Sequence, residues 1–99
     1  MEYEWDESKR RTALGKHGVD FQKAAFIFEG PVLTVDDRRK DYGELRQISI
    51  GVVDGEIYVV VHTDRSGVIR IISAWKGGED DRERYYAGLA RGTASHPRH

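Results

Sequence analysis

The sequence has no cysteine, no excess of charge of either sign and no long run of apolar residues. Without cysteine it can form neither disulfides nor thiolate metal sites, which agrees with a reducing compartment. Residues 1–6 are acidic instead of apolar, and no segment approaches the length that spans a membrane. We therefore expect a cytoplasmic protein that does not associate with a membrane.

Charged residues make up 33 % of the 99 residues, yet the net charge is only −1. Bulk electrostatics therefore do not indicate a nucleic-acid binder, and any basic surface must be local. A chain of this length forms one domain with a modest core. We expect a single domain over residues 1–91 and a disordered tail over 92–99, because the tail has no apolar periodicity.

The spacing of histidine, glycine and serine favours neither a metal site nor a nucleotide cofactor. The four histidines lack the spacing of protein metal ligands. The glycines do not form a phosphate-binding fingerprint, and the serines lack a nucleophile elbow. We therefore expect no metal and no cofactor.

The N-terminal third predicts two helices. Residues 3–5 can form a short edge strand, after which Asp6 is a good N-cap for a helix that ends near Lys16. Asp20 is positioned to cap a second helix, which Gly30-Pro31 ends. Its apolar residues recur at helical spacing: Phe21, Ala24, Ala25 and Phe28. A brief strand over 32–35 and a solvated polar loop over 36–43 are expected next.

From residue 46 the apolar period changes to two, which predicts strands. Asp54-Gly55 is a strong hairpin signal, and a two-residue loop there sets the register. The resulting pairs share one apolar face: Val52 with Ile57, Ile50 with Val59, and Ile48 with Val61. We expect the two N-terminal helices to pack on this first face.

A second hairpin is expected around Gly67. With an even-length loop, the first face continues through Val68, Ile72 and Ala74, while Arg46, Thr63 and Arg70 gather at one end. The reverse face then carries Tyr58, Val60, His62, Ile69, Ile71, Ser73 and Trp75, and we expect either the last helix or a partner to cover it. Asp80 and Glu83 resemble a capping box for a last helix that ends near Ala90. The predicted class is α+β, with an antiparallel sheet and a C-terminal helix.

Cationic and acid/base side chains collect where these strands end. They are the groups that RNA cleavage by its own 2′-hydroxyl requires: a base, an acid, and cations that hold the phosphate. Arginine suits the phosphate role because its planar fork can bind two oxygens. The alternative is that these groups form solvated ion pairs, with Arg70 reaching the sheet edge as a structural residue.

An ordered set of segments resembles the BrnT toxin family. The segments are Glu4-Trp5-Asp6-Glu7-Ser8-Lys9, Lys16-His17-Gly18-Val19-Asp20-Phe21, Phe28, Val60-Val61-His62-Thr63-Asp64-Arg65, Ile69-Arg70-Ile71-Ile72-Ser73-Ala74, and Glu83-Arg84 before Tyr86. The resemblance implies a RelE-like fold and a bacterial ribonuclease that arrests translation. It also implies neutralisation by a BrnA-like antitoxin and contact with operator DNA only through that antitoxin.

The candidate site residues fall into two groups. The catalytic candidates are Arg65, Arg70 and Lys76 as phosphate contacts and Glu83 as the base. The RNA-binding or auxiliary candidates are Lys16, His17, Arg46, His62, Trp75, Arg84 and Tyr86.

Two features depart from the family pattern. Trp75 stands where the family usually has an arginine, and the chain is slightly acidic where such toxins are usually basic. Trp75 could instead stack on an RNA base. A second hypothesis follows, in which the protein is a catalytically weak binding protein that acts through its antitoxin and operator DNA.

Overall fold

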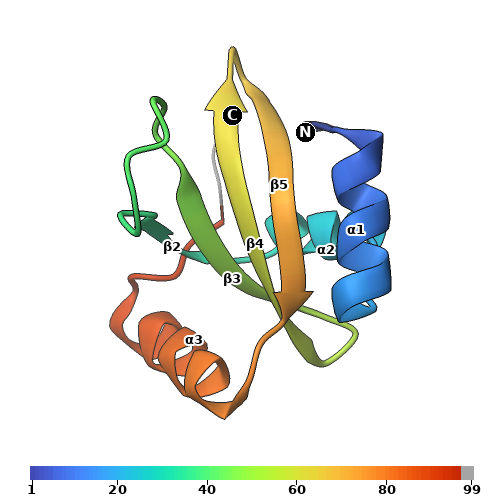
Figure 1. Cartoon of the computed structure of the whole chain (residues 1–99). Coiled ribbons are helices and arrows are strands. Elements are labelled where there is room, and N and C mark those ends of the chain that lie inside the picture. Colours follow the sequence, from blue (N-terminus) through green and yellow to red (C-terminus); the bar gives the residue numbers. More distant parts are fainter. Residues whose placement is uncertain (97–99) are drawn as a thin grey trace.

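The computed structural model of the chain describes residues 1–96 and contains one mixed five-stranded sheet with helices on both faces (Figure 1). The elements in chain order are β1 (Glu2–Trp5), α1 (Glu7–His17), α2 (Phe21–Ala24), the 3₁₀ helix η1 (Ala25–Glu29), β2 (Leu33–Asp36), β3 (Gln47–Val53), β4 (Glu56–Arg65), β5 (Val68–Lys76) and α3 (Glu79–Arg91). The strand order is β1-β5-β4-β3-β2. The α+β class is confirmed. The sheet is not wholly antiparallel, because β1 pairs in parallel with β5. No helix within residues 1–96 has the length and apolar character needed to cross a membrane.

The predicted caps of the N-terminal helices are confirmed, but the second helix is not regular. Asp6 accepts hydrogen bonds from the backbone N–H groups of Ser8 and Lys9, and Asp20 accepts one from that of Gln22. The second helix is one α turn, α2, followed by η1. The predicted apolar residues Phe21, Ala24, Ala25 and Phe28 are all buried, and Ile27 is buried with them.

The first hairpin has the predicted register. Val52 lies opposite Ile57, Ile50 opposite Val59, and Ile48 opposite Val61. Asp54 and Gly55 both have positive φ, of 51° and 78°. A two-residue turn with both residues in this region matches the right-handed twist of the strands.

The second hairpin contains a β-bulge, which reverses the predicted orientations of the three residues that follow it. Thr63 lies opposite Arg70 as expected, but the register shifts between Val61 and His62. Ile72 is the extra residue of β5, because His62 lies opposite Ile71 and Val61 opposite Ser73. Beyond it, Ala74 pairs with Val60 on the reverse face and Trp75 pairs with Val59 on the first face. Ser73 likewise pairs with Val61 of the first face, so the predicted faces of Ser73, Ala74 and Trp75 were wrong.

The helices cover the opposite faces of the sheet from those predicted. The core under α1, α2 and η1 contains Phe21, Phe28, Tyr58, Val60, Ile69 and Ile71. The core under α3 contains Ile50, Ile57, Val59 and Tyr85. The predicted seat of the N-terminal helices was thus wrong. The predicted partner surface was also wrong, because Tyr58 and Ile69 are only 5 % and 3 % exposed. Both faces are apolar, so the alternation could not identify which helices cover which face.

α3 is held by its cap and by contacts with β2. Its N-cap is Gly78, whose N–H donates to Asp81 Oδ2 at 3.0 Å, so Asp81 supplies the capping carboxylate instead of Glu83. The hydroxyl of Tyr85 donates to the backbone oxygen of Pro31 at 2.8 Å. Beyond α3, Ala94 is buried and Ser95 forms a β-bridge with Val32, although the sequence assigned both to the tail. Residues 97–99 of that tail lie outside the described residues.

Candidate nucleic-acid interface

Three adjoining hollows run from α1 across the end of β5 to α3. The first is about 240 Å³ and includes Lys9, Lys16 and His17 of α1 in its lining. The second is about 430 Å³ and is lined by His17, Trp75 and Lys76. The third is about 170 Å³ and includes Trp75, Asp81 and Arg84 in a lining that is otherwise apolar. His17 and Trp75 each line two hollows, so the three form one surface. We call it the cationic groove and define it by Lys9, Thr12, Lys16, His17, Ser73, Trp75, Lys76 and Arg84.

The local sequence explains why these side chains meet. Lys9, Thr12 and Lys16 are spaced at i, i+3 and i+7 and therefore lie along one face of α1. This face borders β5, whose Ser73 lines the same hollow. The bulge in β5 turns Trp75 to the face that α3 covers. There its ring centroid lies 6.1 Å from that of His17, with 49° between the ring planes.

Cations outnumber carboxylates along the groove, where Asp81 is the acidic residue among those that line the three hollows. Within residues 1–96, Lys9, Lys16 and Arg84 have no ion pair. Lys76 is different, because its Nζ lies 2.8 Å from Glu56 Oε2. The hydrogen bond and charge of Glu56 raise the pKa of Lys76. Three cations of the groove are thus free to meet an anion.

The predicted arginines lie at the other end of the sheet, where carboxylates bind them. Arg65 and Arg46 both contact Glu44, at 3.3 Å and 3.5 Å, and Arg70 Nη1 lies 3.7 Å from Glu4 Oε1. Arg46 also stacks on Tyr42, 4.0 Å from the ring centroid. Arg70 precedes Lys76 by six residues of β5, or about 20 Å along a strand.

Most of the loop over residues 36–43 is solvated, as the sequence predicted, but Asp37 is buried. Asp37 is only 6 % exposed. Arg39 donates to both of its carboxylate oxygens, from Nε and Nη2, at 2.8 Å each. The hydrogen bond from Arg39 is the main reason that the pKa of Asp37 is lowered to about 2.

The candidates on α3 separate around the helix. Arg84 lines the groove, whereas the exposed Glu83 is not among the lining residues. Tyr86 is 46 % exposed, and its ring contacts Tyr85 and Arg82. The structure therefore brings Lys16, His17, Trp75, Lys76 and Arg84 together, without Glu83.

His62 is a core residue and does not line the groove. Its Nε2 lies 2.7 Å from the hydroxyl of Ser49, which is in turn 2.7 Å from that of Thr34. The ring of Phe28 meets the imidazole edge-on, with centroids 5.0 Å apart. Burial lowers the pKa of His62 to about 4, so the imidazole is neutral at neutral pH.

Lys9, Thr12 and Ser73 line the groove but were not among the sequence candidates. For the two α1 residues, a signal existed in their helical spacing with Lys16. For Ser73 there was none, because the bulge decides its face. Residues 1–96 contain no group of three or more His, Asp or Glu side chains that could hold a metal ion.

Comparison with known families identifies the chain. A family model described as the ribonuclease toxin BrnT of a type II toxin–antitoxin system matches residues 5–81. No curated protein matches the sequence. The matched segment contains β2 to β5 and every residue of the cationic groove except Arg84. The chain therefore belongs to the BrnT family of ribonuclease toxins of type II toxin–antitoxin systems.

Proposed function

We propose that this protein is a metal-independent endoribonuclease toxin that binds single-stranded RNA in the cationic groove and inhibits translation in the bacterial cytoplasm. The observation that carries this proposal is the placement of unpaired cations on both sides of a half-buried tryptophan. Proteins that bind single strands combine such a cationic track with aromatic rings on which bases stack. A RelE-like mode of action is consistent with the α+β class.

In the proposed complex, RNA phosphates contact Lys9, Lys16 and Arg84, while one base stacks on Trp75. The strand continues along the border of α1 and β5 towards Arg70. Arg70 is paired in register with Glu4, just before α1 begins, so it stands at the far end of this border. At this end an RNA phosphate replaces Glu4 as the ion-pair partner of Arg70. Arg65 and Arg46 are further phosphate contacts at that end.

The proposed reaction is transfer of the phosphate to the neighbouring 2′-oxygen. The 2′-oxygen forms a bond to phosphorus as the bond from phosphorus to the 5′-oxygen breaks. A base takes the 2′-hydroxyl proton, and an acid gives a proton to the leaving 5′-oxygen. The products are a 2′,3′-cyclic phosphate and a 5′-hydroxyl. Lys76 and the groove cations stabilise the charge on the phosphate.

We assign proton transfer to His17, because its imidazole lines the groove beside Trp75 and can act as base or acid. The sequence favoured Glu83, which the structure places outside the groove lining. The substitutions His17→Gln and Glu83→Gln distinguish these two assignments of proton transfer. We expect the first to abolish most cleavage with RNA affinity retained, and the second to have the smaller effect on the rate.

Membership of a type II family implies an antitoxin partner. We propose that this partner is BrnA-like, that it holds the toxin inactive, and that operator DNA is reached only through the complex. No observation favours the alternative of a binding protein without catalysis, and the cleavage assay described at the end of the Discussion tests it.

The RNA-binding part of the proposal is tested by comparing two exposed, unpaired cations of α1. Lys16 lines the groove and Arg11 does not. We expect Lys16→Ala to weaken binding of a single-stranded RNA and to reduce the salt slope by about 0.7, and Arg11→Ala to leave both unchanged. Trp75→Ala should cost about 1–3 kcal/mol of binding free energy through lost stacking. Equal losses for Lys16→Ala and Arg11→Ala would show that binding is diffuse and not located in the groove.

A further inference from the structure

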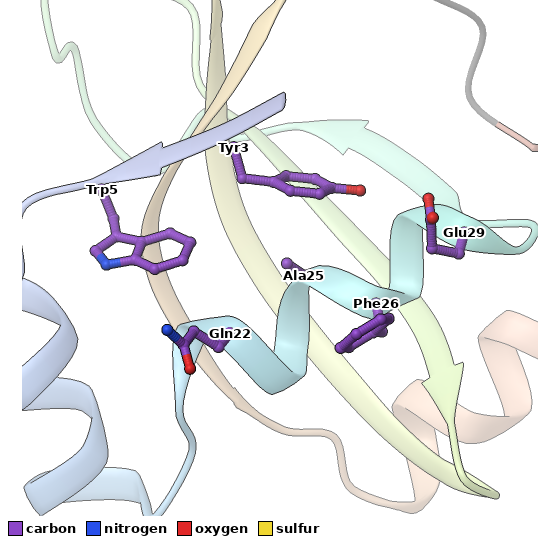
Figure 2. A pocket seen from close by; sticks show the side chains of 6 residues that line it. All are labelled: Tyr3, Trp5, Gln22, Ala25, Phe26 and Glu29. Carbon is purple, nitrogen blue, oxygen red and sulfur yellow. The ribbon is translucent and has the colours of Figure 1, made fainter. Parts of the chain in front are cut away.

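A separate hollow lies between β1 and the segment formed by α2 and η1. It shares no lining residue with the cationic groove. Its volume is about 340 Å³. Figure 2 shows Tyr3 and Trp5 of β1 pointing towards the helical segment that carries Gln22, Ala25, Phe26 and Glu29. The lining is mostly apolar. We call this surface the β1 hollow and define it by these six residues.

The β1 hollow is an open extension of the core. Tyr3 packs against Phe28 with ring centroids 6.0 Å apart, and Trp5 meets Phe21 edge-on at 6.2 Å. Both rings are only half-buried, so they also line the hollow. Phe26 is 59 % exposed beside them. An exposed phenylalanine that adjoins two aromatic rings is typical of an interaction site.

The hollow is bordered by a free strand edge. β1 is the outermost strand of the sheet, and within residues 1–96 it pairs on one side only, with β5. Its outer N–H and C=O groups can therefore pair with a strand from another chain. Because side chains alternate along a strand, the side chains on one face of an added strand would lie over the hollow.

Charge around this edge selects the kind of partner. β1 carries Glu2 and Glu4, which alternate with its aromatic residues, and Glu29 lines the hollow. Burial raises the pKa of Tyr3, and the charge and hydrogen bond of Glu29 raise it further. A second copy of β1 would place glutamates against glutamates, and like charges on opposed strands are destabilising. A strand with lysine or arginine at these positions would be attracted.

We propose that the β1 edge is the docking site of the antitoxin, an inference that rests on the toxin–antitoxin function proposed above. The docked segment is an extended strand of the antitoxin that pairs with β1. Its apolar side chains enter the β1 hollow against Phe26, and its basic side chains meet Glu2 and Glu29. The site lies apart from the cationic groove, so anchoring the antitoxin does not require displacement of RNA from its lining.

The test compares two exposed apolar residues as aspartate variants. Phe26 lies in the hollow, whereas Leu45 is 63 % exposed and lies outside it. The probe is the purified product of the reading frame beside the toxin gene, titrated into the full chain by calorimetry. We expect Phe26→Asp to raise Kd about tenfold or more, as loss of an aromatic anchor does, and Leu45→Asp to leave Kd unchanged. Glu29→Lys should also weaken binding, most at low salt.

Hydrogen exchange tests separately whether the antitoxin strand pairs with β1. The amides of residues 2–5 should gain protection from hydrogen exchange in the antitoxin complex, and unchanged exchange would contradict pairing at this edge. Failure of the wild-type chain to bind the probe, or equal Kd values for wild type and Phe26→Asp, would overturn the proposal. So would a homodimer that Phe26→Asp dissociates. RNA cleavage is measured separately on each folded variant. A Phe26→Asp variant that cleaves RNA and binds the probe with the Kd of wild type would refute the docking site without refuting the ribonuclease function.

Discussion

His62 is a neutral imidazole inside the core, and its environment predicts a pH dependence of stability. Its pKa is about 4 in the folded chain because it is buried, against about 6.5 when unfolded. As pH falls from about 6.5 to 4, the unfolded chain binds a proton that the folded chain does not. The free energy of unfolding should therefore fall in this window by about 3 kcal/mol, while His62 contributes no pH dependence above it.

Urea unfolding at pH 7 and pH 4.5 measures this effect. Carboxylates with a lowered pKa, such as Glu56 beside Lys76, also begin to lose their contribution to stability as pH approaches 4.5, so the comparison must be with a variant. The loss of stability between the two pH values should be smaller in His62→Gln than in wild type. Equal losses in the two proteins would show that His62 does not hold the predicted low pKa.

At the residue scale, the sequence located part of the groove and could not locate the rest. Lys16, His17 and Arg84 were identified as candidates from the sequence and do line the groove. The groove role of Trp75 depends on the bulge at Ile72, and no turn residue signals that bulge in the sequence. The arginines Arg65 and Arg70 were expected to meet Lys76, but a strand of this length keeps its two ends apart.

At the element scale, the contact between η1 and β3 requires glycine at position 51. A Cβ added there would lie 2.6 Å from Ile27 Cβ, which is too close for either backbone to remain in place. Gly51→Ala should therefore destabilise the protein by about 1–3 kcal/mol, although alanine normally suits a strand better than glycine.

Gly15 of α1 provides the matched control substitution. A Cβ there would meet nothing within 4 Å, and its φ is not positive. Gly15→Ala should stabilise the protein by about 0.5–1 kcal/mol, because glycine is a poor helix former. Thermal or urea unfolding of the two variants gives the comparison. A stabilising Gly51→Ala would mean that η1 does not pack on β3 as described.

The elements themselves were more predictable than their arrangement. Local signals such as Asp6, Asp20 and Asp54-Gly55 fix the caps and the first turn, and these expectations are confirmed. Which helices cover which face depends on competition between two apolar faces of similar character. Only the completed packing decides this, and it placed α3 over Ile50 and Val59.

At the scale of the whole molecule, the protein has two separate surfaces. The cationic groove borders α1, β5 and α3, and the β1 hollow lies between β1 and η1. This separation would let a chain with a net charge of −1 bind both the RNA and the basic partner proposed above. Cations without ion pairs line the groove, while Glu2 and Glu29 lie at the β1 edge and hollow.

Cleavage of single-stranded RNA by the purified protein in EDTA tests the central claim most directly. The account predicts fragments with 2′,3′-cyclic phosphate and 5′-hydroxyl ends. Lys16→Ala should lower the rate, by up to about 100-fold if this cation contacts the reacting phosphate. Trp75→Arg should raise the rate, because an arginine can still stack on a base through its guanidinium plane and adds the usual family cation beside Lys76. The contradictory result is that wild type and Trp75→Arg both leave naked RNA and the mRNA of translating ribosomes intact, which would leave the protein as a binding protein without catalysis.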